Sequence, residues 1–168
     1  LREQIRETKK RTDKPFAVNL MLQMDNISEQ VDLLIEEKVK IVTTGAGTPK
    51  PHMKQLKQAG IKVFPVVPSV KLAKKMEQLG VDGIIAEGME AGGHIGETTT
   101  MTLIPQVAQA TELPLIAAGG IGDGRGMAAA FALGAQGVQM GTAFLLAAEC
   151  PIHENYQQAI IRANDTAT

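Results

Sequence analysis

A glycine-rich loop in the middle of the chain carries the residues best suited to chemistry. Residues 86–96 read AEGMEAGGHIG, with four glycines, two carboxylates and one histidine. Glycine has no Cβ, so the backbone there can approach a ligand closely. The imidazole of His94 can exchange a proton or donate a hydrogen bond near neutral pH. We therefore predict that His94 is a catalytic residue, the alternative being a hydrogen-bonded surface histidine.

The two carboxylates of this loop are less specific signals. Glu87 and Glu90 can each orient a base or hold a ligand hydroxyl. Both can equally be solvated side chains, Glu90 more so than Glu87. No pair of histidines in the chain has the spacing of metal ligands, so we predict no protein-bound metal.

Two later glycine turns are suited to binding a phosphate. Gly119-Gly120 follows one apolar run, and Gly141-Thr142 follows the next. Exposed backbone N–H groups at neighbouring strand ends, together with a threonine hydroxyl, can hold a phosphate dianion without a lysine. The alternative is that both are tight turns that need positive φ. Because the turns follow consecutive strands, we favour the phosphate site.

Two polar residues interrupt apolar runs that read as buried strands. They are Asn19, within residues 16–22, and Gln139, within residues 137–142. Each side chain either satisfies a hydrogen bond in the core or points at a ligand and bonds a heterocycle or its sugar chain. The sequence leaves both readings open.

The elements that must position these residues follow a regular strand–helix pattern. The helices between strands begin near polar residues that can cap them, including Ser28, Ser69 and Asp123. Short connections and alternating units of this kind form a parallel sheet with right-handed crossovers. The expected strands cover residues 16–22, 40–45, 61–67, 83–86, 113–118 and 137–142.

Two architectures are compatible with this pattern, an open doubly wound sheet and a (β/α)8 TIM barrel. The barrel is favoured because no Gly-x-Gly-x-x-Gly opens a helix after the first strand. Two late strands also end in phosphate-type turns, as in barrels. A complete barrel needs about 250 residues. We therefore predict one partial barrel domain over residues 1–168, with about six βα units. Two of the eight units would then lie outside the chain.

Composition excludes several classes of function. The net charge of the chain is −1, which gives no electrostatic footprint for nucleic acid. No apolar run approaches the ~20 residues that span a bilayer, so we expect no membrane partner. The charged first helix is not a secretory signal. Cys150 is the only cysteine, which fits a reducing compartment, and we expect a cytoplasmic protein. The chain begins without Met inside an expected helix, as a fragment would.

The loop from Ala86 to Gly96 resembles the signature of FMN-dependent enoyl-acyl-carrier-protein reductases II, which belong with the nitronate monooxygenases. Further blocks resemble motifs of this family and occur in the same order along the chain, and their residues are closer to those of the reductases. They are residues 15–22, 42–47 (VTTGAG), 65–70 (PVVPSV), 116–121 (IAAGGI) and 138–142 (VQMGT).

The resemblance implies a TIM barrel that carries FMN at its mouth. It also implies that the parts of the barrel outside this chain are the first two βα units and a C-terminal part. The family's catalytic histidine falls on His94. The FMN phosphate contacts fall on the glycine turns, and the ring and ribityl contacts fall on strand residues and the loop backbone. With Glu87 added, the candidate cofactor contacts are Asn19, Glu87, Gly92, Gly93, Gly119, Gly120, Gln139, Gly141 and Thr142.

The implied reaction belongs to fatty acid biosynthesis. NADH or NADPH reduces FMN, which delivers hydride to a trans-2-enoyl thioester carried by acyl carrier protein, and a homodimer is compatible with this reading. One alternative is a nitronate monooxygenase that oxidises alkyl nitronates with FMN and oxygen. Another is a flavin- or phosphate-binding barrel fragment without turnover.

Overall fold

Helices and strands alternate up to residue 145 in the computed structural model, which describes residues 1–93 and 95–164, and a last helix follows without a strand before it. The strands are β1 (Ala17–Met21), β2 (Ile41–Gly45), β3 (Lys62–Val67), β4 (Ile84–Glu87), β5 (Leu115–Ala118) and β6 (Gly137–Gln139). The helices are α1 (Arg2–Arg11), α2 (Ile27–Glu36), α3 (Met53–Gln58), α4 (Val70–Gln78), α5 (Thr100–Ala110), α6 (Gly124–Ala132), α7 (Thr142–Leu145) and α8 (Glu154–Arg162). All six predicted strands are found.

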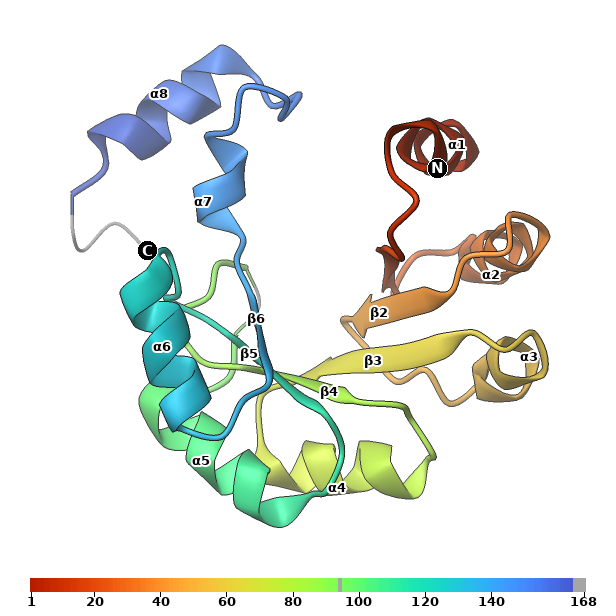
Figure 1. The fold of residues 1–168 in the computed structure, drawn as a ribbon, viewed down its shortest axis with the longest axis horizontal. Helices are drawn as coiled ribbons and strands as arrows, with labels where there is room; N and C mark the ends of the chain where they lie inside the picture. The colour runs from red at the N-terminus through yellow and green to blue at the C-terminus, as the bar shows by residue number, and fades with distance from the viewer. Residues whose placement is uncertain (94, 165–168) are drawn as a thin grey trace.

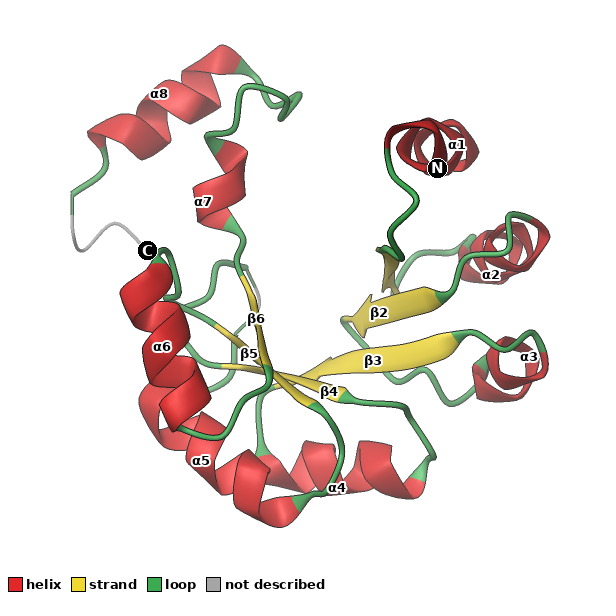
Figure 2. Ribbon diagram, in the orientation of Figure 1, coloured by secondary structure: helices red, strands yellow, loops and turns green. Residues whose placement is uncertain are grey.

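The six strands form one parallel sheet whose spatial order is the chain order, β1 to β6. The sheet curls, and helices α2 to α6 lie along its outer side (Figures 1 and 2). A doubly wound sheet would reverse its strand order and carry helices on both faces. The architecture is therefore that of a partial TIM barrel, and the predicted barrel is confirmed.

The hydrophobic core lies between the outer face of the sheet and the helices. Side chains alternate along each strand, so that every second residue faces the helices. In β1, Val18 and Leu20 are buried, whereas Ala17, Asn19 and Met21 are exposed on the inner face. The core is aliphatic, as the low aromatic content requires. Its strand residues include Leu20, Val42, Val63, Val67, Ile84, Ala86, Leu115 and Ala117.

Two predicted helix starts are confirmed and one is wrong. Ser69 and Asp123 cap α4 and α6, because their side chains accept hydrogen bonds from backbone N–H groups of the first turn. Ser28 does not cap α2. That helix begins at Ile27, with Asn26 at the N-cap position and no side-chain cap.

The last strand is shorter than predicted, since β6 ends at Gln139 and not at residue 142. Gly141 takes the N-cap position of α7, and Thr142 is the first residue of that helix. Both residues therefore lie in the turn beyond the strand, where their N–H groups are not used by the sheet. Among the described residues, no helix has the length and apolar character needed to cross a membrane.

Candidate functional site

A cavity of about 570 Å³ opens at the carboxyl ends of β4, β5 and β6. Its size falls within the usual range for small-molecule sites, about 300–1,000 Å³. This end of a parallel barrel is the one where ligands bind. Eight of the ten residues predicted for the site line this cavity: Glu87, Gly92, Gly93, Gly119, Gly120, Gln139, Gly141 and Thr142.

The last residues of three neighbouring strands form a row beneath the cavity. Glu87 pairs in register with Ala118, and Ala118 pairs with Gln139. All three residues line the cavity. Burial raises the pKa of the Glu87 carboxyl group. A carboxyl group with a raised pKa in a cleft is a candidate for a functional role.

The Gly119-Gly120 turn is one that only glycine can make. The φ angles are +103° at Gly119 and +68° at Gly120. A Cβ on Gly119 would lie 2.7 Å from the hydroxyl oxygen of Thr100 and 2.9 Å from the carbonyl oxygen of Gly88. Both the backbone and the packing therefore require glycine at position 119.

Gly92 and Gly141 line the same cavity for a different reason. Gly141 has a φ of −106°, and Gly92 is not among the glycines with positive φ. A Cβ on either residue would meet no atom within 4 Å. Neither the backbone nor the packing explains these two glycines. What they leave is open space in the cavity wall, as a bound group would need.

Glu90 and Thr100, which lie on opposite sides of the loop, are joined at the cavity rim. The Thr100 N–H donates to both carboxylate oxygens of Glu90, at 2.9 and 3.1 Å, and the Thr100 hydroxyl lies 2.9 Å from Oε2. Burial works against ionisation of Glu90, but hydrogen bonds from Thr100 and from the backbone N–H of Glu90 itself outweigh it and lower the pKa of that carboxyl. The sequence left the role of Glu90 open and did not predict this contact, because no local spacing links residues ten positions apart.

An apolar wall completes the cavity and was not predicted. It combines the turn after β5 with the two C-terminal helices, and its larger side chains are Ile121, Met140, Leu145 and Tyr156. The only signal in the sequence was that short segments near the C-terminus carry apolar and aromatic side chains that they cannot bury by themselves. In the structure, Tyr156 is 53% exposed.

One predicted residue that the structure describes, Asn19, stands apart from this cavity. Asn19 lies on the inner face of β1, outside the cavity lining, and its Oδ1 accepts a hydrogen bond of 3.0 Å from the Thr43 hydroxyl. It is exposed, so the reading of Asn19 as a core residue is wrong. Its contact with a ligand stays a prediction. His94 lies outside the described residues.

Comparison with protein families identifies the chain. The family model described as nitronate monooxygenase matches residues 25–168. The chain belongs to the nitronate monooxygenase family. Members of this family are oxidoreductases that use FMN.

Three relatives show the range within the nitronate monooxygenase family. The structure of FabK from Thermotoga maritima is 52% identical with a TM-score of 0.93, covering 97% of this chain and 52% of that one. The "(3aS,4S,5R,7aS)-5-hydroxy-7a-methyl-1-oxo-octahydro-1H-indene-4-carboxyl-CoA dehydrogenase" of Rhodococcus jostii is 42% identical over 92% of this chain and 44% of the relative. A "probable nitronate monooxygenase" of Staphylococcus saprophyticus is 40% identical over 88% and 45%, respectively. The chain thus spans about half the length of these relatives.

The cavity fits the cofactor of the nitronate monooxygenase family. Gly92 and Gly141 leave open space where a Cβ would stand. The turns after β5 and β6 present backbone N–H groups, which suit a phosphate dianion. Gln139 adds an amide that both donates and accepts, as a flavin edge or ribityl hydroxyl requires.

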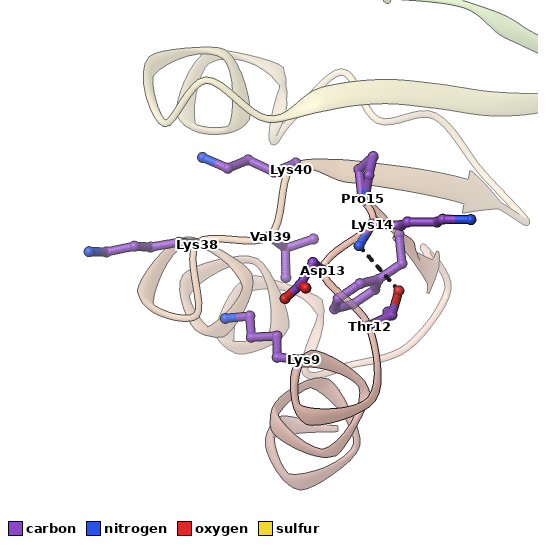
Figure 3. A pocket seen from close by; sticks show the side chains of 9 residues that line it. Lys9, Thr12, Asp13, Lys14, Pro15, Lys38, Val39 and Lys40 are labelled. Carbon is purple, nitrogen blue, oxygen red and sulfur yellow. Dashed lines mark hydrogen bonds between the residues drawn. The ribbon is translucent and has the colours of Figure 1, made fainter.

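A second cavity, of about 360 Å³, lies at the opposite end of the strands. It is lined by residues that precede β1 and β2, including four lysines (Figure 3). The ammonium groups do not converge, since Lys14 points away from Lys38 and Lys40. Lys9 is engaged elsewhere, because it donates to the Glu37 carbonyl and lies 3.7 Å from the Glu37 carboxylate. This arrangement does not form an anion site.

The described ranges also hold no group of three or more His, Cys, Asp or Glu side chains that could bind a metal ion. The cavity at the ends of β4 to β6 is therefore the candidate site of this nitronate monooxygenase family member.

Proposed function

We propose that this chain carries the FMN-binding cradle and the proton donor of an enoyl-acyl-carrier-protein reductase. The proposal is carried by the cavity at the ends of β4, β5 and β6, where eight predicted cofactor contacts meet. The 52% identity with FabK supports the reductase branch of the family. The 42% identity with a relative named as a carboxyl-CoA dehydrogenase supports a thioester substrate.

FMN, when bound, supplies hydride transfer between NAD(P)H and the unsaturated thioester. The protein's own residues bind and orient it. Backbone N–H groups of Gly120 and Gly141 donate to the phosphate, and the Thr142 hydroxyl adds a further donor. The open space at Gly92 lets the loop backbone lie close to the flavin ring.

Polar groups beneath the cavity serve the ring and the ribityl chain. The Gln139 amide can donate to one polar atom and accept from another. Burial raises the pKa of Glu87, so this carboxyl keeps its proton to a higher pH than usual and can donate to a flavin oxygen or a ribityl hydroxyl. Asn19, on the opposite side of the inner face, is the remaining proposed polar contact.

His94 is the proposed catalytic residue. Hydride addition to the β-carbon leaves negative charge on the thioester oxygen, and a histidine N–H placed there stabilises that charge. The same group can protonate the α-carbon.

The deciding experiment uses the full-length FMN-loaded protein without oxygen. NADH or NADPH should bleach the flavin, and crotonyl thioester, on acyl carrier protein or on CoA, should restore its colour. The His94→Ala variant should keep its FMN and lose about 100-fold or more of this rate. Loss of FMN with an unchanged rate per bound flavin would make His94 structural.

A nitronate monooxygenase is the second candidate, favoured by the family model and by the 40% identical relative that bears this name. In that reaction His94 would take the α-proton of a nitroalkane, or a nitronate would be oxidised directly. Oxygen consumption with alkyl nitronates and indifference to enoyl thioesters would establish it over the reductase. A flavin that no nicotinamide cofactor bleaches and no nitronate reduces would indicate a protein that binds FMN without turnover.

A further inference from the structure

The carboxylate of Glu90 holds the start of α5 from ten residues upstream. Thr99 occupies the N-cap position of that helix but gives no side-chain cap, since its hydroxyl oxygen lies 2.9 Å from that of Thr102. Glu90 takes over this role by accepting from the N–H of Thr100 with both oxygens. A carboxylate is well suited to this position, because the N-terminus of a helix carries partial positive charge.

The same contact reaches the Gly119-Gly120 turn. The hydroxyl oxygen of Thr100 lies 2.9 Å from the carbonyl oxygen of Gly119 and 3.3 Å from that of Ala118. A Cβ on Gly120 would stand 3.1 Å from the Cβ of Glu90. A Cβ on Gly88 would collide with Thr100. Three segments therefore meet at Glu90 and Thr100: the loop, the start of α5 and the turn after β5.

The Thr100 hydroxyl lies between the loop and the turn after β5. Its single proton has two acceptors at 2.9 Å, Oε2 of Glu90 and the carbonyl oxygen of Gly119. A glutamine at position 90 would keep one acceptor oxygen and replace the other with an NH2 group. The isosteric substitution therefore removes the charge and one of the two oxygens that accept from the Thr100 N–H, and it keeps the shape.

Contacts hold both ends of the 88–99 loop, whereas its central glycines have open space around them. The Met89 N–H donates to the Thr98 carbonyl at 2.9 Å, and a Cβ on Gly96 would stand 2.5 Å from the Cβ of Pro68. Gly92 and Gly93 are exposed, and a Cβ on either would meet no atom within 4 Å. The conformation of this glycine stretch is therefore set by its flanks and not by its own packing.

We propose that Glu90 is a positioning residue, whose carboxylate ties the 88–99 loop to Thr100 and to the Gly119-Gly120 turn. The tie sets the Gly92-Gly93 backbone over the cavity. The consequence for catalysis rests on the proposed function, because it assumes that the loop carries the proton donor. The effect on the conformation of the loop does not depend on the proposed function.

The test compares Glu90→Gln with Glu97→Gln in the full-length FMN-loaded protein. Glu97 is an exposed glutamate of the same loop and provides the matched loss of one charge. We expect amide hydrogen exchange over residues 88–99 to speed up about tenfold in Glu90→Gln and not in Glu97→Gln. We also expect kcat for crotonyl thioester to fall about tenfold with little change in KM, as for a misplaced catalytic group.

A second variant keeps the proposal open to refutation if Glu90→Gln folds poorly. Thr100→Val removes the hydroxyl and should speed exchange in the same loop. In a folded double variant, the two effects should sum to less than for independent sites, because both substitutions remove the contact between the Thr100 hydroxyl and Oε2 of Glu90. Unchanged loop exchange in both single variants, or exchange that rises equally throughout the protein, would overturn the inference.

The two proposals fail in distinguishable ways. Faster loop exchange in a protein that ignores enoyl thioesters would sink the reductase reading and leave the positioning role intact. Normal reductase activity and normal exchange in Glu90→Gln would do the reverse.

Discussion

The two glycine turns at the mouth of the sheet look alike in sequence and differ in structure. Gly119-Gly120 follows β5 and Gly141-Thr142 follows β6, and both line the same cavity. Gly119 has a φ of +103° and touches Thr100 and Gly88, so a side chain there has no room. Gly141 has a φ of −106°, and a side chain there would enter open space.

This difference shows which glycine is evidence for a ligand. The fold alone explains Gly119, since its backbone and its neighbours both exclude a Cβ. The fold does not explain Gly141, because an alanine fits it on both counts. The stronger indication of a bound phosphate therefore comes from the turn that the fold does not need. The glycine that looks most like a motif is first of all a structural residue.

Gly119→Ala tests the structural half of this comparison and should have the largest effect. The substitution places a Cβ 2.7 Å from the Thr100 hydroxyl oxygen in a backbone conformation that disfavours any side chain. Strain and overpacking each cost about 1–3 kcal/mol, so we expect a loss of roughly 2–6 kcal/mol in the free energy of unfolding. Urea denaturation of the protein without FMN measures it.

Gly122→Ala is the matched control for that prediction. Gly122 lines the same cavity, but it has no positive φ and no atom within 4 Å of its Cβ position. Its free energy of unfolding should change by less than about 0.5 kcal/mol. Equal losses in the two variants would show that the Gly119 contacts are not what holds the turn.

Gly141→Leu tests the ligand half of the comparison. The side chain would stand in open space, so the free energy of unfolding should change by no more than about 0.5 kcal/mol. The same side chain would occupy the place proposed for the phosphate end of FMN. We expect the Kd for FMN to rise about 100-fold, equivalent to about 2.7 kcal/mol. Quenching of flavin fluorescence during titration measures the Kd.

Gly124→Ala serves as the control, because Gly124 also has open space at its Cβ position but lies in α6, outside the cavity lining. It should bind FMN as the wild type does. If Gly141→Leu binds FMN with unchanged affinity, the phosphate does not lie at this turn, and the proposed orientation of the cofactor is wrong.

Much of the fold was readable from the sequence for a simple physical reason. Parallel strands are covered by helices, so each strand appears as a short apolar run closed by glycines or polar residues. The runs ending at Ala86 and Ala118 are of this kind, and the loops that follow carry the predicted site. The order of the strands confirmed the barrel.

What the sequence did not reveal depends on distance in space. The contact of Glu90 with Thr100 joins residues ten positions apart through a loop without regular periodicity. The position of Asn19 depends on how far the sheet curls between β1 and β4, which no local pattern encodes. Ser28 was a reasonable cap by residue type, yet α2 begins one residue earlier, at Ile27. Local preference is easily outweighed there by tertiary packing.

The two glutamates of the loop, Glu87 and Glu90, provide the test with the smallest expected effect. Glu87 lies beneath the open cavity, and burial raises its pKa. Its neutral form is therefore favoured by folding, and that contribution is present at low pH and lost as pH rises through the folded pKa. Glu87→Gln cannot ionise at this position, so its stability does not fall in this way. Between about pH 4 and pH 7 the urea midpoint of the variant should therefore rise relative to that of the wild type.

The stability of Glu90→Gln should follow the opposite trend with pH, since Glu90 is bonded to Thr100 beside the Gly119-Gly120 turn. Against the effect of burial, hydrogen bonds from Thr100 and from its own backbone N–H lower the pKa of Glu90, so their contribution to stability is present above the unfolded pKa and lost in acid. Glu90→Gln should therefore be less stable than the wild type at pH 7, and the deficit should shrink toward about pH 4. Parallel pH profiles for the two variants would mean that Glu87 and Glu90 do not lie in different environments. Profiles that diverge with pH would place the change from the open cavity to the contact with Thr100 between residues 87 and 90.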